Sequence, residues 1–268
     1  MGKSVKIAVI GHLPSKMRLP AEFSYLTRKS DVDLSPTIPT DHNFNADSFV
    51  WSEYGAWFEN SSILNDADIT GLYHYRCALN LFRRPIDDLP INLRYIFLKF
   101  QIPKLHEYRN TLAVGEPNFV PEGVWGQFLS AHPESEEILL SACKHYDSLL
   151  NHSPGSAIAR ITQSNFYYPR NIFVSDTKYG KAWMDLSFKL AVALDTEFPA
   201  APNNRWGGFV LERIFSLFVE DFAEENDIAI KTFKQIYFLP LIPWVKSKLL
   251  KKKFVKAIQR ILLGRRTL

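Results

Sequence analysis

The chain has 268 residues, of which 46% are hydrophobic and 14% aromatic. That length and composition fit one globular domain with a sizeable core, and they exclude a disordered or repetitive chain. The two cysteines, Cys77 and Cys143, lack the spacing of a zinc site and allow one disulfide at most, which favours a reducing compartment.

Charge is distributed unevenly along the chain, although the formal net charge is only +4. No acidic residue follows Asp227, whereas eleven of the 32 basic residues do. The first 227 residues therefore hold 21 basic and 28 acidic groups, a net charge of −7. An acidic body argues against a nucleic-acid partner, and a basic tail favours contact with an anionic surface.

The N-terminal third predicts two strands and one helix. The apolar run Lys6–His12 stops at glycine, as the first strand of an α/β domain does, and residues 13–46 are rich in Pro, Ser, Asn and Asp and predict loops. Asp47–Asn60 predicts a helix that begins at Asp47 or Ser48, and Ile69–Tyr75 predicts a buried strand.

The remaining elements continue to alternate between strand and helix. They are a helix over Ile91–Ile102, a strand and loop over Thr111–Val120, a helix over Glu134–Leu150, an extended stretch over Phe166–Ser175, a helix from Asp176 or Thr177 to Leu194, a helix over Gly207–Glu225 and a strand over Ile228–Phe238. This alternation predicts an α/β fold with a mixed or parallel sheet that is covered on both faces.

No segment of the sequence predicts passage through a membrane. The apolar run Ile7–Ile10 is too short for the core of a signal peptide, and no later run is long enough to span a bilayer. We therefore expect a cytoplasmic protein.

Three polar residues, His74, Tyr75 and Arg76, stand where the buried strand ends. Ligands collect at the C-terminal ends of parallel strands, and a guanidinium suits phosphate. The alternative is that these residues cap the sheet and pair with neighbouring carboxylates, and the residues alone do not decide between the two.

Glu53 lies on the apolar face of its predicted helix. At roughly 100° per residue, it falls between Phe49 and Trp57. A buried carboxylate needs a partner. Either Glu53 forms a structural ion pair, or it binds a substrate hydroxyl or orients Arg76.

The stretch RWGGFVLER offers a third candidate site. Gly207 and Gly208 would let the backbone approach a ligand or act as a hinge. Glu212 follows in the first turns of the helix. It is either a catalytic carboxylate or a solvated residue that the helix dipole favours.

Common cofactor signals are missing from the sequence. It contains neither a Gly-rich phosphate loop nor zinc spacing. The carboxylate pairs Asp31–Asp33 and Asp66–Asp68 do not follow apolar strands, where a metal-binding pair for a diphosphate is expected.

Four segments in order, SEYGAWFEN, ITGLYHYR, RNIFVSDTKYGKAWMD and GGFVLERIFSLF, resemble a bacterial glycosyltransferase-like family found in capsular polysaccharide and O-antigen gene clusters. The resemblance spans most of residues 5–225. It implies a single Rossmann-like, GT-A-like nucleotide-diphospho-sugar transferase domain, which we place at residues 1–240, with a sugar-nucleotide donor and a growing glycan acceptor. Members often carry a second Arg after His-Tyr-Arg, where this chain has Cys77.

The resemblance also implies a role for several residues. His74 and Arg76 would neutralise the diphosphate directly, without a metal or other cofactor. Glu212 would deprotonate the acceptor hydroxyl or position the sugar. Arg213 would contact phosphate or pair with Glu53.

Three further positions complete this set. Gly11 and His12 would lie near the nucleotide base, and Asn171 would face the sugar or the acceptor. Two other functions stay open. One is a sugar-nucleotide mutase or isomerase that uses the same pocket. The other is a non-catalytic sugar-nucleotide-binding scaffold of a polysaccharide assembly complex.

Residues 241–268 predict a basic amphipathic helix. Its apolar side holds Leu250, Phe254, Ala257, Ile258, Ile261 and Leu262, and its basic side holds Lys248, Lys252, Lys253, Lys256 and Arg260. Such a helix suits an anionic membrane surface, which predicts a peripheral protein at the inner face of the cell membrane, near a lipid-linked acceptor. Alternatively, the helix packs on the acidic body.

Overall fold

The computed structural model describes residues 4–10, 21–26, 51, 54–59, 67–74, 77–81, 98, 100–108, 110–199 and 206–237. The strands are β1 (Val5–Ile10), β2 (Phe23–Leu26), β3 (Ile69–His74), β4 (Cys77–Leu79), β5 (Thr111–Gly115), β6 (Asn118–Phe119), β7 (Phe166–Tyr167), β8 (Phe173–Asp176), β9 (Ala229–Phe233) and β10 (Gln235–Tyr237). The α-helices are α1 (Tyr54–Glu59), α3 (Gly123–Ala131), α4 (Glu136–Leu149), α5 (Ser156–Gln163), α6 (Thr177–Glu197) and α7 (Trp206–Glu225), and the 3-10 turns are η3 (Pro133–Ser135) and η4 (Pro169–Asn171).

A mixed sheet of eight strands organises the fold. β1 runs parallel to both β2 and β3, whereas β8 runs antiparallel to its neighbours β3 and β5. β9 lies parallel to β5 at the far edge, and β4 and β10 extend the sheet beyond the end of β3. The predicted α/β class with a mixed sheet is confirmed.

Alternate residues of the central strands supply a core on each face of the sheet. Ala8 and Ile10 of β1 belong to one buried cluster, which α1 and α3 to α7 complete. Ile7 and Val9 belong to a second cluster, which includes Leu105 and Tyr108. Because the strands are buried on both faces, they read as continuous apolar runs in the sequence.

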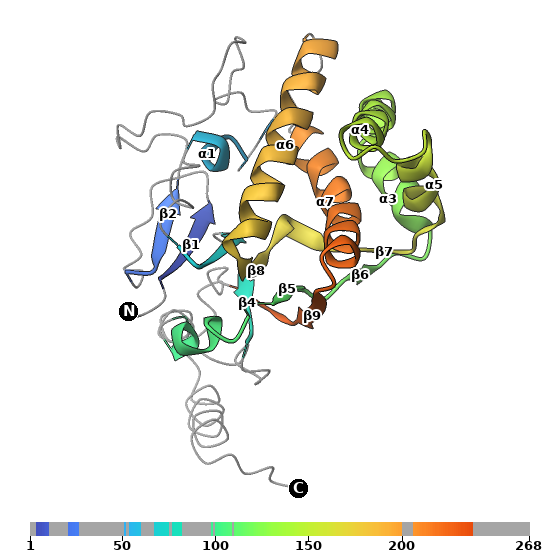
Figure 1. Ribbon diagram of the computed structural model, residues 1–268. Helices are drawn as coiled ribbons and strands as arrows, with labels where there is room; N and C mark the ends of the chain where they lie inside the picture. Colours follow the sequence, from blue (N-terminus) through green and yellow to red (C-terminus); the bar gives the residue numbers. More distant parts are fainter. Residues whose placement is uncertain are drawn as a thin grey trace, which may run out of the picture.

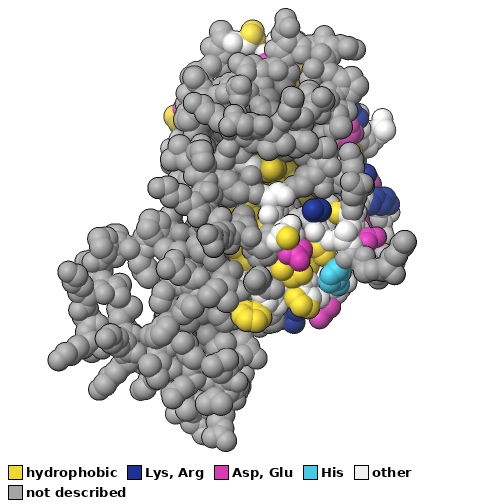
Figure 2. Space-filling model, turned by 90° about the vertical axis from the view of Figure 1, so that its left-hand side faces the viewer, with side chains coloured by type: hydrophobic (Ala, Val, Ile, Leu, Met, Phe, Trp, Pro, Cys, Tyr) yellow, Lys and Arg dark blue, Asp and Glu magenta, His cyan; other side chains and the backbone are white. Residues whose placement is uncertain are grey.

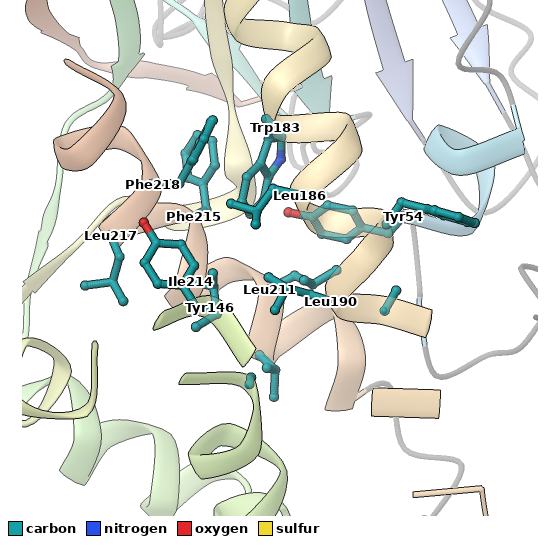
Figure 3. Close-up of a cluster of buried hydrophobic side chains, with 14 of the residues drawn as sticks. Tyr54, Tyr146, Trp183, Leu186, Leu190, Leu211, Ile214, Phe215, Leu217 and Phe218 are labelled. Carbon is teal, nitrogen blue, oxygen red and sulfur yellow. The ribbon is translucent and has the colours of Figure 1, made fainter. Parts of the chain in front are cut away.

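The larger core lies between α6 and α7, which run side by side over the sheet (Figure 1). Trp183 of α6 packs its ring against Phe215 and Phe218 of α7, with ring centroids 5.1 Å apart in each pair. Figure 3 shows these rings facing one another, with Tyr54 of α1 and Tyr146 of α4 at the margins of the cluster. The helices α3, α4 and α5 gather beyond α7 (Figure 1).

Several predicted elements are confirmed with small shifts of their ends. α4, α6 and α7 match the three predicted helices, and the Asp176 side chain accepts a hydrogen bond from the backbone N–H of Tyr179 at 3.3 Å, as a helix N-cap does. Of the first predicted helix, Tyr54–Glu59 is helical, and Trp51 lies in a 3-10 turn. α3 and α5 lie where the sequence analysis predicts no helix.

The strand predicted over Ile228–Phe238 is wrong as a single element. The chain forms β9 beside β5, breaks at Lys234 and then forms β10 beside β4. The carbonyl of Lys234 accepts a hydrogen bond from the Asn80 N–H at 2.8 Å, which holds the chain in place where it passes from β9 to β10. Two short strands therefore close two separate edges of the sheet.

Residues 241–268, for which a basic helix is predicted, lie outside the described residues. Among the residues that are described, no helix combines the length and the apolar character needed to cross a membrane. Cys77 and Cys143 are both buried thiols, and they form no disulfide with each other.

Candidate functional site at the strand ends

Three strands meet at the edge of the sheet where the sequence analysis places the site. Ile10, the last residue of β1, pairs with His74, the last residue of β3. β8 runs the other way and pairs Phe173 with Leu72. His74 itself pairs with Cys77 of β4, and the turn η4, which contains Asn171, lies against β3 just before β8 begins. The register therefore brings the end of β3 and the start of β8 to one edge.

Four of the predicted donor-site residues come directly after β1 or β3 in the sequence. Gly11 and His12 come after β1, and Tyr75 and Arg76 connect His74 to Cys77, which pair with each other. All four, and Glu53, lie outside the described residues, so their roles stay predictions. His74 is described, and it is half-buried.

The turn that precedes β8 has an unusual backbone. Arg170 has φ of 65° and Asn171 has φ of 53°, so two consecutive residues without glycine's freedom lie in the left-handed region. Asn adopts this conformation readily, whereas Arg does so at a cost of about 1–2 kcal/mol. Such strain is found at ligand sites when the surroundings hold it in place.

Glu212 of α7 holds this turn. Its Oε1 accepts a hydrogen bond from the backbone N–H of Arg170 at 2.5 Å. Its Oε2 accepts one from Arg213 Nη1 at 2.7 Å. One turn further along α7, Ser216 Oγ accepts the N–H of Tyr168 at 2.9 Å. Each carboxylate oxygen of Glu212 retains a further lone pair, so these contacts leave a role as a base chemically open.

Arg213 is buried among internal partners. Its Nη2 donates to Gln127 Oε1 at 2.5 Å, and its Cζ lies 4.2 Å from the ring centroid of Tyr167. The side chain is only 3% exposed. The contacts described for Arg213 are thus with the protein itself, and its predicted contact with phosphate or with Glu53 stays a prediction.

Asn171 carries the least satisfied polar group of the turn. The residue is 5% exposed, and its Oδ1 has no hydrogen-bond partner among the described residues. A buried amide oxygen without a partner costs about 1–3 kcal/mol. This group therefore has free capacity to bind a polar ligand, in line with the predicted sugar or acceptor contact.

Gly207 and Gly208 lie in the first turn of α7, directly after Trp206. The Trp206 ring packs edge-on against Trp51, with centroids 5.2 Å apart, so the start of α7 is anchored in the core. The predicted ligand contact of the two glycines stays a prediction.

His132, at the end of α3, stacks its ring on Phe209 of α7, with ring centroids 4.1 Å apart. Burial is the main cause that lowers the pKa of His132, and the charge of Glu134 opposes this shift.

Sequence reasoning missed Arg170, Gln235 and Tyr237. Arg170 Nη1 donates to Gln235 Oε1 at 2.6 Å and to Tyr237 Oη at 3.0 Å. No motif marks Gln235 and Tyr237, because their proximity to Arg170 depends on β10 lying beside β4. The one available signal was the RN pair directly before an apolar strand.

Metal ligands do not gather in the part of the chain that the structure describes. No three His, Cys, Asp or Glu side chains there are placed to hold an ion together.

Comparison with known proteins supports the fold. The chain resembles the apo structure of WbbM, a bifunctional glycosyltransferase, with a TM-score of 0.62 and 17% identity. The match covers 91% of this chain and 48% of that one, so the chain spans about half the length of its structural neighbour. No family model matches the chain, and no curated protein matches its sequence. The fold is a GT-A-like Rossmann domain, as the sequence resemblance implies.

The unpaired amide of Asn171 leads to a prediction about stability. Asn171→Gly should change the free energy of unfolding by less than about 1 kcal/mol, because it removes an unsatisfied buried group and glycine suits the backbone. Asn151→Gly is the matched control, since Asn151 has φ of 56° and an exposed side chain. Denaturant unfolding of both variants measures the difference. A loss of more than about 2 kcal/mol relative to the control would show that the Asn171 amide holds the fold rather than a ligand.

Proposed function

We propose that the chain is a glycosyltransferase that moves a sugar from a nucleoside-diphosphate donor to the growing glycan of a surface polysaccharide, either a capsule or an O-antigen. The observation that carries the proposal is the similarity of the fold to a glycosyltransferase over 91% of the chain. The unpaired Asn171 amide and the strained turn, placed where α/β sheets bind ligands, support it.

The proposed reaction joins the acceptor hydroxyl oxygen to the anomeric carbon of the donor. The bond between that carbon and the diphosphate breaks, and the nucleoside diphosphate leaves with the bonding electrons. His74, Tyr75 and Arg76 would stabilise the negative charge on the leaving group directly, without a metal. Glu212 would take the proton of the acceptor hydroxyl.

The other proposed roles concern substrate binding. Gly11 and His12 would contact the nucleotide base, and Asn171 would contact the sugar or the acceptor. Gly207 and Gly208 would let the backbone approach the ligand. On the described part of the face in Figure 2, basic and acidic side chains are interspersed, which supports a small-molecule donor rather than a nucleic acid.

A panel of sugar nucleotides, with and without a glycan acceptor, tests the proposal. We expect release of nucleoside diphosphate that rises with acceptor, together with a product heavier by one sugar. The same rate is expected after exhaustive treatment with a chelator, because cationic side chains would replace the metal. Nucleotide release and product mass are the measurements.

Other outcomes separate the competing functions. A changed sugar on an intact diphosphate would indicate a mutase or isomerase, and binding without turnover would indicate a scaffold. Activity that disappears with chelator and returns with manganese or magnesium would contradict the metal-independent mechanism while leaving the transferase in place.

Glu212→Gln tests the proposed base. Turnover should fall by about 10²–10⁴-fold while the dissociation constant of the donor changes little. Glu220→Gln is the matched control, because Glu220 lies on the same helix and pairs with Arg160 at 2.9 Å instead of with the Arg170 backbone or Arg213. If Glu212→Gln turns over at the control rate, Glu212 only positions the turn.

We further propose that residues 241–268 bind the inner surface of the cell membrane, where a lipid-linked acceptor would be found. Each basic residue near an anionic surface contributes about 1 kcal/mol, and salt screens this attraction. Truncation after Tyr237 should abolish sedimentation with anionic liposomes and leave the body folded. Failure of the full chain to bind at low salt would refute the membrane role. Unfolding of the truncated body would instead assign the tail to core packing.

A further inference from the structure

Among the described residues, the Arg170 guanidinium donates hydrogen bonds only to neutral side chains. Nη1 donates to Gln235 Oε1 at 2.6 Å and to Tyr237 Oη at 3.0 Å, and Cζ lies 5.0 Å from the Tyr237 ring centroid. The side chain is half-buried. These contacts fix one edge of the guanidinium and leave Nη2 and Nε, the two nitrogens of the opposite edge, to form a planar fork of donors.

Two other arginines, the half-buried Arg160 and the buried Arg213, show how a structural arginine is paired in this protein. Arg160 pairs with Asp221 at 2.5 Å and with Glu220 at 2.9 Å. Arg213 pairs with Glu212 at 2.7 Å. Among the described residues, no carboxylate forms an ion pair with the Arg170 guanidinium. Its charge therefore has no carboxylate partner in direct contact there.

Glu212 acts on this charge only from a distance, because it forms no ion pair with the Arg170 guanidinium. It binds the backbone N–H of Arg170 through Oε1 and the guanidinium of Arg213 through Oε2. Two guanidiniums and one carboxylate leave this cluster with a net positive charge. A half-buried cation without a counter-ion is costly, unless an anion binds it.

Gly115 at the end of β5 makes the neutral contact possible. A Cβ at this position would lie 2.5 Å from Gln235 Nε2 and 3.3 Å from Gln235 Cδ. The absence of a side chain at Gly115 thus lets the Gln235 amide lie over the end of β5 and reach Arg170. Gln235 and Tyr237 are positioning residues for the guanidinium.

The place of Arg170 in the sheet indicates which anion it binds. It lies in η4, which contacts β3 and directly precedes β8 at the edge where β1 and β3 end. We propose that Arg170 binds the diphosphate of the nucleoside-diphosphate donor through its free fork of donors, a geometry that matches phosphate oxygens. This inference rests on the proposed function for the identity of the ligand, and on the contacts above for the site.

Three variants test the site by titration calorimetry with pyrophosphate, uridine diphosphate and guanosine diphosphate, at low salt and with chelator present. Arg170→Gln should weaken binding by about 10- to 100-fold, the usual size of a charge-assisted contact. Lys189→Gln removes the same charge from the exposed face of α6, where Lys189 pairs with Asp185 at 2.7 Å, and should leave binding unchanged.

Gln235→Glu is the sharper test, because it leaves Arg170 in place. It would set a carboxylate beside Nη1 and neutralise the guanidinium, so binding should weaken by about 10-fold while the unfolding temperature stays equal or rises. A purely structural Arg170 predicts unchanged binding in this variant. Thermal unfolding of every variant verifies that it is folded.

The outcomes separate this inference from the proposed function. The role of Arg170 would be overturned if both variants, Arg170→Gln and Gln235→Glu, bound the probes with dissociation constants within about twofold of that of the original chain. This holds even if sugar transfer is observed. Failure of the original chain to bind any of the three probes would overturn it as well. Binding of pyrophosphate that depends on Arg170, without turnover of any sugar nucleotide, would support the anion site and refute the transferase.

Discussion

The candidate site depends on the carboxylate of Glu212, which bridges a backbone N–H and a buried guanidinium. Through Oε1 it holds the left-handed turn at Arg170, and through Oε2 it holds Arg213 against Gln127 and Tyr167. A carboxylate that is only 16% exposed is tolerable because both oxygens are bonded. Without this bridge, nothing described on α7 would hold the Arg170 backbone in its costly conformation.

The sheet then determines what this turn can reach. Ile10 pairs with His74, and β8 starts beside them, so one edge collects the ends of β1 and β3 and the turn before β8. The interior of the sheet is apolar on both faces, which leaves the strand ends as the place where polar side chains remain hydrated or bind a ligand. The position of the site is thus a consequence of burial.

Sequence patterns predicted the elements that burial dictates. The apolar run of β3 and the helical periodicity of α4, α6 and α7 are visible without a structure, because each buries a continuous stripe. α5 was missed because it has only eight residues and begins after Gly155 at φ of 86°, so it shows too few turns for a period. Glu212 was singled out from its place in the helix and Asn171 from the resemblance, and the structure brings the Glu212 side chain to the turn that holds Asn171.

The features that sequence could not predict are those that arise from non-local pairing. Gln235 reads as an ordinary strand residue, and it reaches Arg170 only because the chain breaks at Lys234 and β10 joins β4. Gly115 reads as the end of a strand, yet its missing side chain makes room for that contact. Neither contact can be predicted from the residues that lie next to it in the sequence.

Two consecutive residues combine three unfavourable features. The left-handed backbone, the unpaired Asn171 oxygen and the Arg170 charge without an ion pair each cost stability, and all three lie in η4. In a chain selected for stability alone, glycine would suit this backbone better than arginine, and a glutamate at position 235 would neutralise the cation. Such costs persist at sites that are completed by a ligand. An anion with oxygen acceptors would complete the site at η4, because it would neutralise the Arg170 guanidinium. A hydrogen-bond donor next to that anion would then pair with the Asn171 amide oxygen.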